Sequence, residues 1–564
     1  MIRLHALAFV SILSTMPILA QGIGNIQAQA RNGQVFITWN EKDLPPNATI
    51  AIYHDKKPIN NIANARLLAK DILPGSARNW WKDSRSFNPN KPDPNYKPTG
   101  FIIENNTKPL DPNTGLHVHT VDEQTSGAAF FAVAWDKQLI ATSNPINAKQ
   151  ERVSPVWTGS EPAPEKDCAK GKALRLVLHG RGGGGVSNTN YTFFANKEQG
   201  WREGLAFDFK VNFGKDVVDI VPMDRTWINR FVKESADSRD HCNAINSWWF
   251  GYNTNINETT NTPEIIVDNY TQKWILAVLD WANEYLGTDP NRNYLTGGSM
   301  GGSASIAFGL QFPERFAALY AMVPVYEYTW EGCSTSKSLT AARLACACGP
   351  MKTTTAKMTN GQNVLDYMNG RLNIANAKAD TPPIFATNGR KDASIPWNNN
   401  PGFYDEANKA RQAFAVFWND GNHGMTSQAP DDVKAWNSHI FKYALNKSFP
   451  AFSNSSDNKN YGNGTPEDGD LVGWINRGMD WINLIDTKDK YQITIIANYP
   501  GIVYPINVDV TLRRRQQFLP KPGDKLSLDI NGKTQAFTMP NDAILTIPRV
   551  AITSPEGTTI IITK

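Results

Sequence analysis

Between residues 173 and 420, short apolar segments alternate with helical patterns, and this alternation constrains the fold more than any other feature of the chain. The apolar runs are "ALRLVLHG" (173–180), "DVVDIVPMD" (216–224), "NRNYLTGG" (291–298), "FAALYAMVPV" (316–325), "PIFATNG" (383–389) and "AFAVFWND" (413–420). A helical spacing relates Trp274, Ile275, Val278, Leu279 and Ala282, and a further helix is expected near 402–411. Strands that alternate with helices form a mainly parallel sheet with helices on both faces. We therefore expect an α/β domain over residues 151–450.

β-type segments flank this region on both sides. Short β-branched and aromatic runs between 24 and 150, such as "GQVFITWN" and "AAFFAVAW", predict a β-sandwich with Trp39 turned inward. This stretch resembles a fibronectin type III module, apart from a Trp/Pro/Asn-rich insertion at about 79–98. A second β domain is expected over 471–564, where "YQITIIANY" and "TTIIITK" show the same composition. Two stretches, 154–172 and 450–470, are interpreted as a linker and a flexible connection.

The first twenty residues have the composition of a secretory signal peptide. Arg3 precedes a short apolar run, and Ala20 is a small residue at the expected cleavage point. We expect a secreted protein, extracellular or periplasmic, that is soluble after cleavage; an uncleaved N-terminal anchor is the alternative. The formal net charge is +4 without a long basic run, which argues against a nucleic-acid partner. Charge and composition leave the oligomeric state open.

Five cysteines follow the predicted signal peptide. Because the number is odd, at least one of them is unpaired or bonded to another chain. A bond from Cys333 to Cys346 or Cys348 would close a short loop, and one from Cys168 to Cys242 a longer loop. No four ligands converge at a spacing typical of zinc. His117 and His119 share one face of a predicted strand, and surface histidines explain them better than a metal pair.

The sequence "LTGGSMGGSAS" (295–305) contains Ser299 within a GxSxG spacing. Gly297 and Gly301 permit a strained turn from a strand into a helix, which projects the serine hydroxyl clear of the sheet. The apolar strand before the motif and the apolar helix after it supply the context that the motif requires. Ser299 is therefore a candidate nucleophile, and a tight turn without chemistry is the alternative.

A serine hydroxyl needs a base that removes its proton, and an acid that orients the base. His423 follows the predicted strand 413–420, so its loop lies at the carboxyl edge of the sheet together with Ser299. Its competitor His439 lies in a predicted helix. Asp392 follows the strand 383–389 and precedes His423 by 31 positions. A turn-forming role is the alternative for Asp392, and Asp380, Asp405 and Asp420 are less well placed.

The remaining requirement is a site that binds the oxyanion of the transition state. The glycine run "HGRGGGG" (179–185) directly follows a predicted strand, and glycines leave backbone amides accessible to a small anion. One amide would come from Arg181 or Gly182, and the other from Met300, the residue after the nucleophile. The run lacks the GxxxxGK[ST] pattern of a nucleotide-binding loop.

With HGRGGG, GGSMGG, GRKD and GNHG in this order, residues 170–445 resemble the α/β-hydrolase superfamily. The resemblance implies that Ser299 is the nucleophile, His423 the general base and acid, and Asp392 the orienting acid, with no metal and no cofactor. Within the superfamily, export and the flanking β modules resemble secreted esterases, among them feruloyl and acetyl-xylan esterases and polyester depolymerases. The neighbourhood of the serine is shared with prolyl-oligopeptidase-like peptidases, but the N-terminal region lacks propeller repeats.

Two insertions, 225–263 and 326–382, follow predicted strands and should overhang the carboxyl edge of the sheet. They contain Trp248, Trp249 and Trp330, which together with Trp397 are candidate substrate-binding residues through stacking on sugar or aryl groups. The alternative is that these aromatic residues form the cores of the insertions.

The sequence therefore predicts a serine esterase whose partner is an ester substrate. One form of this hypothesis has a polymeric ester as the substrate. A peptidase with the same three residues is one alternative. An inert exported binding protein is another, although such a protein has no need of His423 and Asp392 on those loops.

Overall fold

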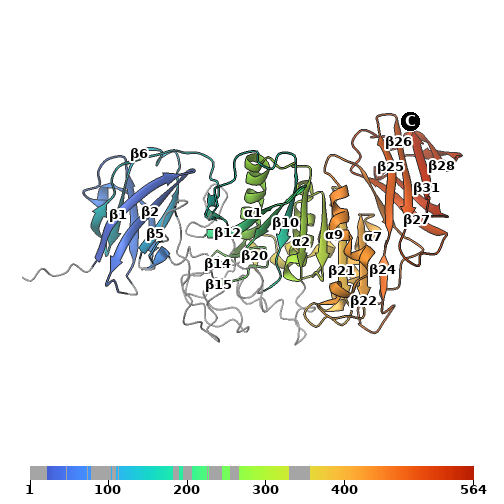
Figure 1. Ribbon diagram of the computed structural model, residues 1–564, viewed down its shortest axis with the longest axis horizontal. Coiled ribbons are helices and arrows are strands. Elements are labelled where there is room, and N and C mark those ends of the chain that lie inside the picture. The colour runs from blue at the N-terminus through green and yellow to red at the C-terminus, as the bar shows by residue number, and fades with distance from the viewer. Residues whose placement is uncertain are drawn as a thin grey trace, which may run out of the picture. The chain divides into compact units, whose positions relative to one another are not determined.

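The computed structural model describes residues 22–45, 48–72, 74–77, 103, 110–111, 114–159, 161–181, 190–194, 206–224, 226–227, 244–254, 266–328 and 356–564. The chain divides into two compact units. Unit 1 comprises residues 1–80 and 109–153, and unit 2 comprises residues 81–108 and 154–564. Figure 1 shows the described elements of both units.

Unit 1 contains two antiparallel sheets that enclose one apolar core. The first sheet has the order β1-β2-β5 and the second the order β4-β3-β6-β7, with β8 paired to β6. The strands are β1 (Gly22–Arg31), β2 (Gln34–Lys42), β3 (Ile50–Asp55), β4 (Arg66–Ile72), β5 (Thr114–Thr120), β6 (Gly127–Trp135), β7 (Gln138–Thr142) and β8 (Ile146–Ala148). Trp39 is fully buried in this core, as predicted. The closer likeness to a fibronectin type III module stays a prediction.

The histidines of β5 lie inside unit 1, and the prediction of surface positions was wrong. His117 is 6% exposed and His119 is fully buried. A hydrogen bond of 3.1 Å joins His119 Nε2 to Thr125 Oγ1. All seven residues of β5 are buried, because this strand packs with both faces covered. Neither histidine forms part of a metal-binding cluster among the described residues.

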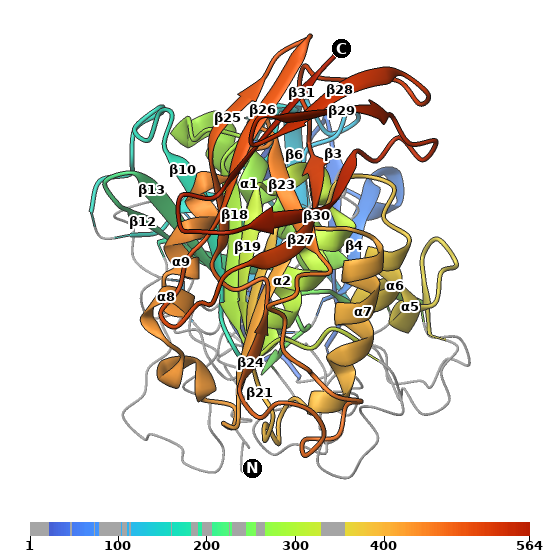
Figure 2. The same cartoon turned by 90° about the vertical axis from the view of Figure 1, so that its right-hand side faces the viewer.

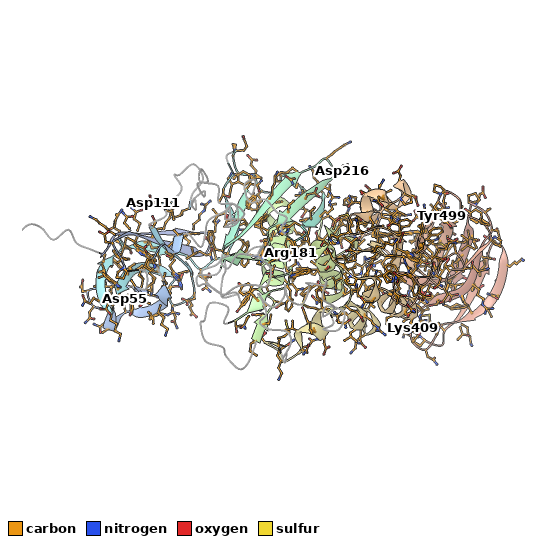
Figure 3. The ribbon with its side chains drawn as sticks, turned by 90° about the horizontal axis from the view of Figure 1, so that it is seen from below. Asp55, Asp111, Arg181, Asp216, Lys409 and Tyr499 are labelled. Atoms are coloured by element: carbon orange, nitrogen blue, oxygen red, sulfur yellow. The ribbon has the colours of Figure 1, made fainter. Side chains whose placement is uncertain are left out.

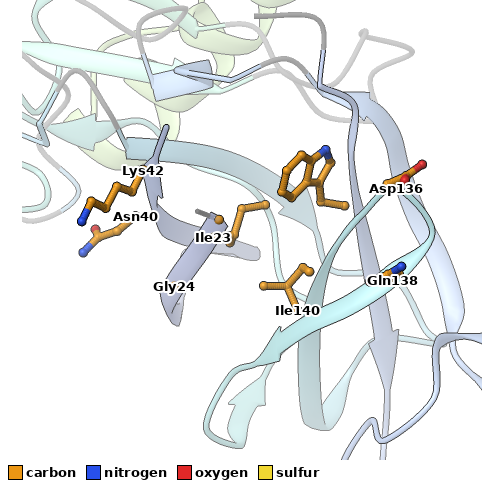
Figure 4. Close-up of a pocket in the computed structure, with 9 residues that line it drawn as sticks. Ile23, Gly24, Asn40, Lys42, Asp136, Gln138 and Ile140 are labelled. Carbon is orange, nitrogen blue, oxygen red and sulfur yellow. The ribbon is translucent and has the colours of Figure 1, made fainter. Parts of the chain in front are cut away.

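An open groove of 780 Å³ lies on unit 1 (Figure 4). Residues from β1, β2, β6 and β7 and the turn between the last two form its wall. They are Gly22, Ile23, Gly24, Asn40, Lys42, Trp135, Asp136, Gln138 and Ile140. None of the predicted site residues lies there.

Unit 2 contains a ten-stranded sheet with the order β24-β22-β21-β19-β18-β10-β13-β12-β11-β9. Its six central strands are parallel, as predicted. They are β10 (Ala173–Leu178), β13 (Val217–Pro222), β18 (Asn293–Gly298), β19 (Ala318–Met322), β21 (Ile384–Gly389) and β22 (Phe414–Asn419). Each of these strands matches one of the six apolar runs of the sequence, because strands covered on both faces need apolar residues throughout.

Helices cover both faces of this sheet (Figure 2). Helices α2, α6 and α7 lie on one side, and α8 and α9 on the other. The α-helices in the described part of unit 2 are α1 (Tyr270–Trp281), α2 (Met300–Gln311), α5 (Val364–Met368), α6 (Gly370–Ala375), α7 (Pro401–Lys409), α8 (Asp431–Lys434) and α9 (Trp436–His439). The five residues predicted at helical spacing are each at most 1% exposed; Trp274, Ile275, Val278 and Leu279 lie in α1, and Ala282 directly follows it. The periodic pattern thus identified both the helix and its buried face.

The antiparallel edge of the sheet was not predicted. It consists of β12 (Ala206–Phe213), β11 (Tyr191–Phe194) and β9 (Val156–Trp157), and β9 lies within the stretch interpreted as a linker. Trp157 contacts Tyr191 edge to face, and this aromatic contact fastens the short edge strand. Such a strand is set by its tertiary partner, which a two-residue segment does not reveal in sequence.

The C-terminal β region forms two sheets, with the orders β23-β27-β30 and β25-β26-β31-β28-β29. The strands are β23 (Phe449–Ser453), β25 (Met479–Asp486), β26 (Lys490–Ala497), β27 (Ile506–Arg513), β28 (Lys525–Ile530), β29 (Lys533–Thr538), β30 (Thr546–Ile552) and β31 (Thr558–Thr563). Strand β24 (Gly473–Ile475) instead pairs with β22 in the large sheet. The predicted flexible connection 450–470 starts inside β23. Because β23 pairs within the C-terminal sheets and the later strand β24 pairs within the large sheet, this stretch joins the two sheet systems.

Buried arginines attach the C-terminal β region to the rest of unit 2. Arg513 donates to the Asp380 carboxylate at 3.0 Å and to the carbonyl oxygens of Ala410 and Arg411. Arg477 forms a bidentate pair with Asp432, with both distances at 2.8 Å. Apolar residues of the large sheet, α9 and the C-terminal sheets form one continuous cluster. Among the described residues, no helix is long and apolar enough to cross a membrane.

We predict that unit 1 loses stability as the pH falls below about 6.5. Burial lowers the pKa of His54, nearby Arg66 lowers it further, and Asp55 and Asp122 oppose the change. The folded unit therefore binds fewer protons than the unfolded chain, so the free energy of unfolding rises with pH through this window. Calorimetry of the full chain between about pH 5 and pH 8 measures the slope. The variant His54→Phe should flatten it, and an equal slope in the variant would contradict the assignment.

Replacing Arg513 by Met should destabilise unit 2 by about 3 kcal/mol, because Asp380 Oδ1 and two carbonyl oxygens lose the Arg513 donor and Asp380 keeps only the Arg514 amide on its other oxygen. Chemical denaturation followed by tryptophan fluorescence measures the effect. The partly exposed Lys490 in β26 gives a control through Lys490→Met, since no hydrogen bond from its amino group to a buried acceptor is found among the described residues. If the two variants unfold at the same denaturant concentration, Arg513 does not hold the two regions together.

Candidate active site

Ser299 stands on a sharp turn between β18 and α2. Its backbone has φ 56° and ψ −119°, a region that residues with a side chain rarely adopt and that costs about 1–3 kcal/mol. The Ser299 amide donates to the carbonyl oxygen of Met322 at the end of β19, at 2.8 Å. The Ser299 carbonyl oxygen accepts from the Ser303 amide and hydroxyl. Bonds to β19 and to the first turn of α2 therefore hold the strained backbone of Ser299 in place.

The glycines around Ser299 are required by close packing against β10. A Cβ atom on Gly301 would lie 2.0 Å from the carbonyl oxygen of Leu178, and one on Gly297 would lie 2.4 Å from the Gly301 carbonyl carbon. No side chain fits at these distances. The GxSxG spacing thus reflects the contact between the start of α2 and the end of β10.

Asp392 and His423 contact each other at the ends of neighbouring strands. His423 Nδ1 lies 2.6 Å from Asp392 Oδ2. The other carboxylate oxygen, Oδ1, accepts the amides of Ser394 and Ile395 at 2.8 and 3.0 Å. Each oxygen of Asp392 therefore has its own role: Oδ1 stabilises the local turn, and Oδ2 binds the imidazole of His423. Its side chain is 2% exposed, and that of His423 is 36% exposed.

The strand pairing explains why these two residues meet. Beyond the last residue pair of β21 and β22, the Arg390 amide still donates to Asn419 and the Lys391 amide to Gly421, at 3.0 and 2.9 Å. The two loops thus continue the ladder for two more steps. Ser299, Asp392 and His423 all follow the carboxyl ends of parallel strands and so lie at one edge of the sheet. No hydrogen bond joins the Ser299 hydroxyl to His423 in the described structure.

The competing residues have other partners. His439 ends α9, where it packs against Phe385 and lies 3.8 Å from Asp480 of β25; burial lowers its pKa. Asp380 binds Arg513, at the opposite end of β21 from Asp392. The carboxylates of Asp405 and Asp420 contact Tyr461 and Lys391. These contacts agree with the choice of His423 and Asp392 as the pair at the carboxyl edge.

The start of the predicted oxyanion loop lies beside the serine turn. A Cβ atom on Gly180 would lie 3.6 Å from the Ser299 Cβ. Arg181 follows in the chain (Figure 3), and Gly182 lies outside the described residues. Met300 begins α2, so its amide is one of the first-turn groups that the helix leaves unbonded.

Three of the four predicted stacking residues are described and are buried, which contradicts the expectation that these three offer open faces to a substrate. Trp248, Trp249 and Trp397 are 2%, 1% and 1% exposed. Trp248 contacts Tyr328 edge to face, and so links the two insertions. A short parallel pairing also joins Ile266, just after the first insertion, to Lys357 in the second. The aromatic residues thus serve as cores, and Trp330 lies outside the described residues.

Sequence reasoning missed Asp224, which holds the first insertion against His179 at the start of the glycine run. Its buried carboxylate accepts the amides of Ser247 and Trp249 at 3.0 and 2.9 Å, and the Ser247 hydroxyl. The Asp224 amide donates to His179 Nε2 at 3.0 Å, and the Trp249 indole donates to the His179 carbonyl oxygen. These bonds fix the start of the glycine run. An acidic residue directly after an apolar strand was the available signal.

Asn388, the last residue but one of β21, was also missed. Its side-chain oxygen accepts the hydroxyls of Tyr326 and Tyr404, at 3.1 and 3.0 Å. Burial raises the pKa of both phenols, which keeps them neutral donors. This network fastens the strand end that precedes Asp392.

Cys168 is the one cysteine among the described residues, where it is exposed and free. The predicted bonds that involve Cys242, Cys333, Cys346 and Cys348 lie partly or wholly outside those residues. No cluster of three His, Cys, Asp or Glu side chains that could hold a metal ion occurs in the described part of the chain.

Residues 268–448 match the prolyl oligopeptidase family, over a stretch that covers less than half of the chain. This stretch contains Ser299, Asp392 and His423. Together with the parallel sheet, the match supports a serine hydrolase of the α/β-hydrolase type. No curated protein matches the chain.

Several solved structures show low overall likeness. An esterase of Thermogutta terrifontis with bound propionate is 16% identical with a TM-score of 0.27, over 48% of this chain and 81% of that one. An S-formylglutathione hydrolase of Agrobacterium tumefaciens is 11% identical with a TM-score of 0.31, over 57% and 92%. Porphyromonas gingivalis dipeptidyl peptidase 4 is 12% identical with a TM-score of 0.28, over 49% and 32%. TM-scores this low carry no argument about the substrate.

We predict that Gly301→Ala disrupts the serine turn, because its Cβ would lie 2.0 Å from the Leu178 carbonyl oxygen. The expected result is loss of Ser299 labelling by an organophosphate probe, with a lower melting temperature. The control is Gly424→Ala in the His423 loop, where the nearest atom to a new Cβ is the Asn422 Oδ1 at 3.5 Å. Equal labelling of both variants would show that this close approach is not needed.

Proposed function

We propose that the protein is a secreted serine hydrolase that cleaves carboxylic esters through Ser299, His423 and Asp392. The observation that carries the proposal is the 2.6 Å contact of His423 Nδ1 with Asp392 Oδ2 at the sheet edge where the strained serine turn lies. A structural turn has no need of a buried carboxylate bound to a half-exposed imidazole. The match of residues 268–448 to a serine peptidase family supports the same three residues.

In the first half of the reaction, the Ser299 hydroxyl attacks the ester carbonyl carbon. His423 Nε2 accepts the hydroxyl proton, because the Asp392 carboxylate accepts a hydrogen bond from Nδ1–H, which keeps the proton on Nδ1 and leaves Nε2 as the free base. The carbonyl oxygen becomes an oxyanion that the Met300 amide and an amide of the glycine run stabilise. His423 then protonates the leaving alcohol, and an acyl-serine remains.

In the second half, water replaces the alcohol. His423 Nε2 takes a proton from the water, whose oxygen attacks the acyl carbon. The tetrahedral intermediate collapses, Ser299 recovers its proton from His423, and the carboxylic acid leaves. No metal or cofactor takes part in these steps. For the proton transfer to occur, the serine hydroxyl and Nε2 must come within hydrogen-bond distance in the substrate complex.

The ester class is the first choice, and a peptidase is the second candidate because the matching family is one of peptidases. Unit 1 is built of two small antiparallel sheets and contains no propeller among its described residues. A polymeric ester, of a polysaccharide or a polyester, is the proposed substrate type. We also propose export through residues 1–20, which N-terminal analysis of protein recovered from outside the cytoplasm would test.

We predict that the purified protein hydrolyses p-nitrophenyl esters faster than peptide anilides. The variant Ser299→Ala should lower ester turnover at least about 10³-fold, since the acyl-enzyme cannot form. Asp392→Asn should lower kcat by about 10²–10⁴-fold and leave KM near its normal value.

Each other outcome has a definite meaning. Turnover of anilides alone would favour the peptidase. Ester turnover that survives in Ser299→Ala would refute the proposed nucleophile, and absence of any turnover would favour the inert binding protein. Assays on feruloyl and acetyl esters of polysaccharides and on polyester films then define the acyl and alcohol groups.

A further inference from the structure

We infer that Arg390 is a positioning residue for the Asp392–His423 pair, and that it acts by holding residues 460–470 against the two loops that carry this pair. We call residues 460–470 the clasp. The inference rests on the proposed function and extends it to a part of the chain beyond residue 448, where the family match ends. Arg390 follows β21 directly and precedes Asp392 by two residues.

The guanidinium of Arg390 is enclosed by backbone oxygens of the clasp. Nε donates to the Pro466 carbonyl at 2.8 Å, and Nη1 donates to the Asp470 carbonyl at 3.2 Å. Nη2 donates to the carbonyl oxygens of Thr465, at 3.1 Å, and Asp468. The residue is 1% exposed. One side chain therefore donates to four carbonyl oxygens of one loop.

Only arginine can serve all four acceptors. Its planar group directs five N–H bonds over a wide arc, whereas lysine offers three protons from one atom. Burial lowers the pKa of Arg390, and the carboxylates of Asp468, Asp420 and Glu467 oppose that change. These nearby negative charges favour the cation inside the loop.

Two tryptophans fasten the clasp to the same loops. The centre of the Trp397 ring lies 4.9 Å from the Arg390 guanidinium carbon, and its indole donates to the Tyr461 carbonyl oxygen at 3.2 Å. Trp418, at the end of β22, donates to the Asp470 carbonyl oxygen at 2.8 Å. One tryptophan follows Asp392 and the other precedes His423. The clasp is therefore bonded to the loop that carries Asp392 and to the strand that leads into the His423 loop.

The position of Asp392 depends on this arrangement. The Arg390 amide donates to the Asn419 carbonyl oxygen, so a displacement of Arg390 moves the ladder that aligns the two loops. Asp392 binds His423 through a single oxygen, because its other oxygen is engaged in the local turn. A shift of about 1 Å in such a pair lowers the rate by up to about 10²-fold.

The test compares Arg390→Met and Arg390→Lys with a matched buried arginine. Arg513 also donates to backbone carbonyls and an Asp carboxylate, but at the opposite end of β21. Arg390→Met should lower kcat about 10–100-fold with KM unchanged, and Arg390→Lys should recover part of the loss because it keeps the charge. Arg513→Met should lower the melting temperature with kcat within about twofold.

A double-mutant cycle separates positioning from a general loss of structure. In the Asp392→Asn background, Arg390→Met should cause no further fall in kcat, since Arg390 acts through Asp392. Multiplicative losses, or equal losses of kcat in Arg513→Met and Arg390→Met, would overturn the inference. If Arg390→Met does not fold, Trp418→Phe replaces it in the cycle: it removes one donor to the clasp and retains a ring, and its kcat loss must likewise vanish in the Asp392→Asn background.

The inference and the proposed function fail in different ways. If Ser299→Ala retains full turnover, the proposed function is wrong whatever Arg390 does. If Ser299→Ala is inactive while Arg390→Met and Trp418→Phe keep the wild-type kcat, the function stands and only the positioning role is refuted.

Discussion

The site depends on the parallel pairing of β21 with β22, which continues beyond the strands into their loops. Backbone bonds from Arg390 and Lys391 to Asn419 and Gly421 bring Asp392 and His423 to the same level above the sheet. The side-chain bond between them adds little to such a register; it is a consequence of the ladder. Ser299 reaches the same edge because β18 and β19 run in the same direction. One sheet edge thus supplies three residues that are far apart in the chain.

Close approach of backbone to backbone sets the second constraint. The turn at Ser299 is stable in a strained conformation only because Gly301 and Gly297 let α2 and β10 come together. The bonds of Asp224 to His179 and Trp249 then tie the first insertion to the start of the glycine run after β10. A hydroxyl on a rigid turn loses little entropy when it reacts, which is a general advantage of such sites.

Sequence alone predicted the parallel strands and Asp392 with His423 at one edge, because these follow from apolar periodicity and from the direction of parallel strands. It did not predict the edge strands β9 and β24, which have two and three residues and take their conformation from a partner. It placed tryptophans on a substrate surface although Trp249 and Trp397 are core residues: periodicity identifies buried strands, but in a loop it does not show which face an aromatic ring presents. The stretch 450–470 has a composition typical of a flexible connection, yet hydrogen bonds within it, such as Asn463 amide to Asp468, and the bonds from Arg390 hold it in one conformation.

The C-terminal β region is part of the catalytic body rather than an added module. Strand β24 belongs to the large sheet and β23 to the C-terminal sheets, so the chain crosses between them three times from β22 to β25. Their apolar residues form one continuous cluster, which unfolding would have to expose as a whole. In unit 1, by contrast, the two sheets close on their own core. Cooperative unfolding should therefore join the two regions of unit 2, because neither can lose its shared core without exposing the other's.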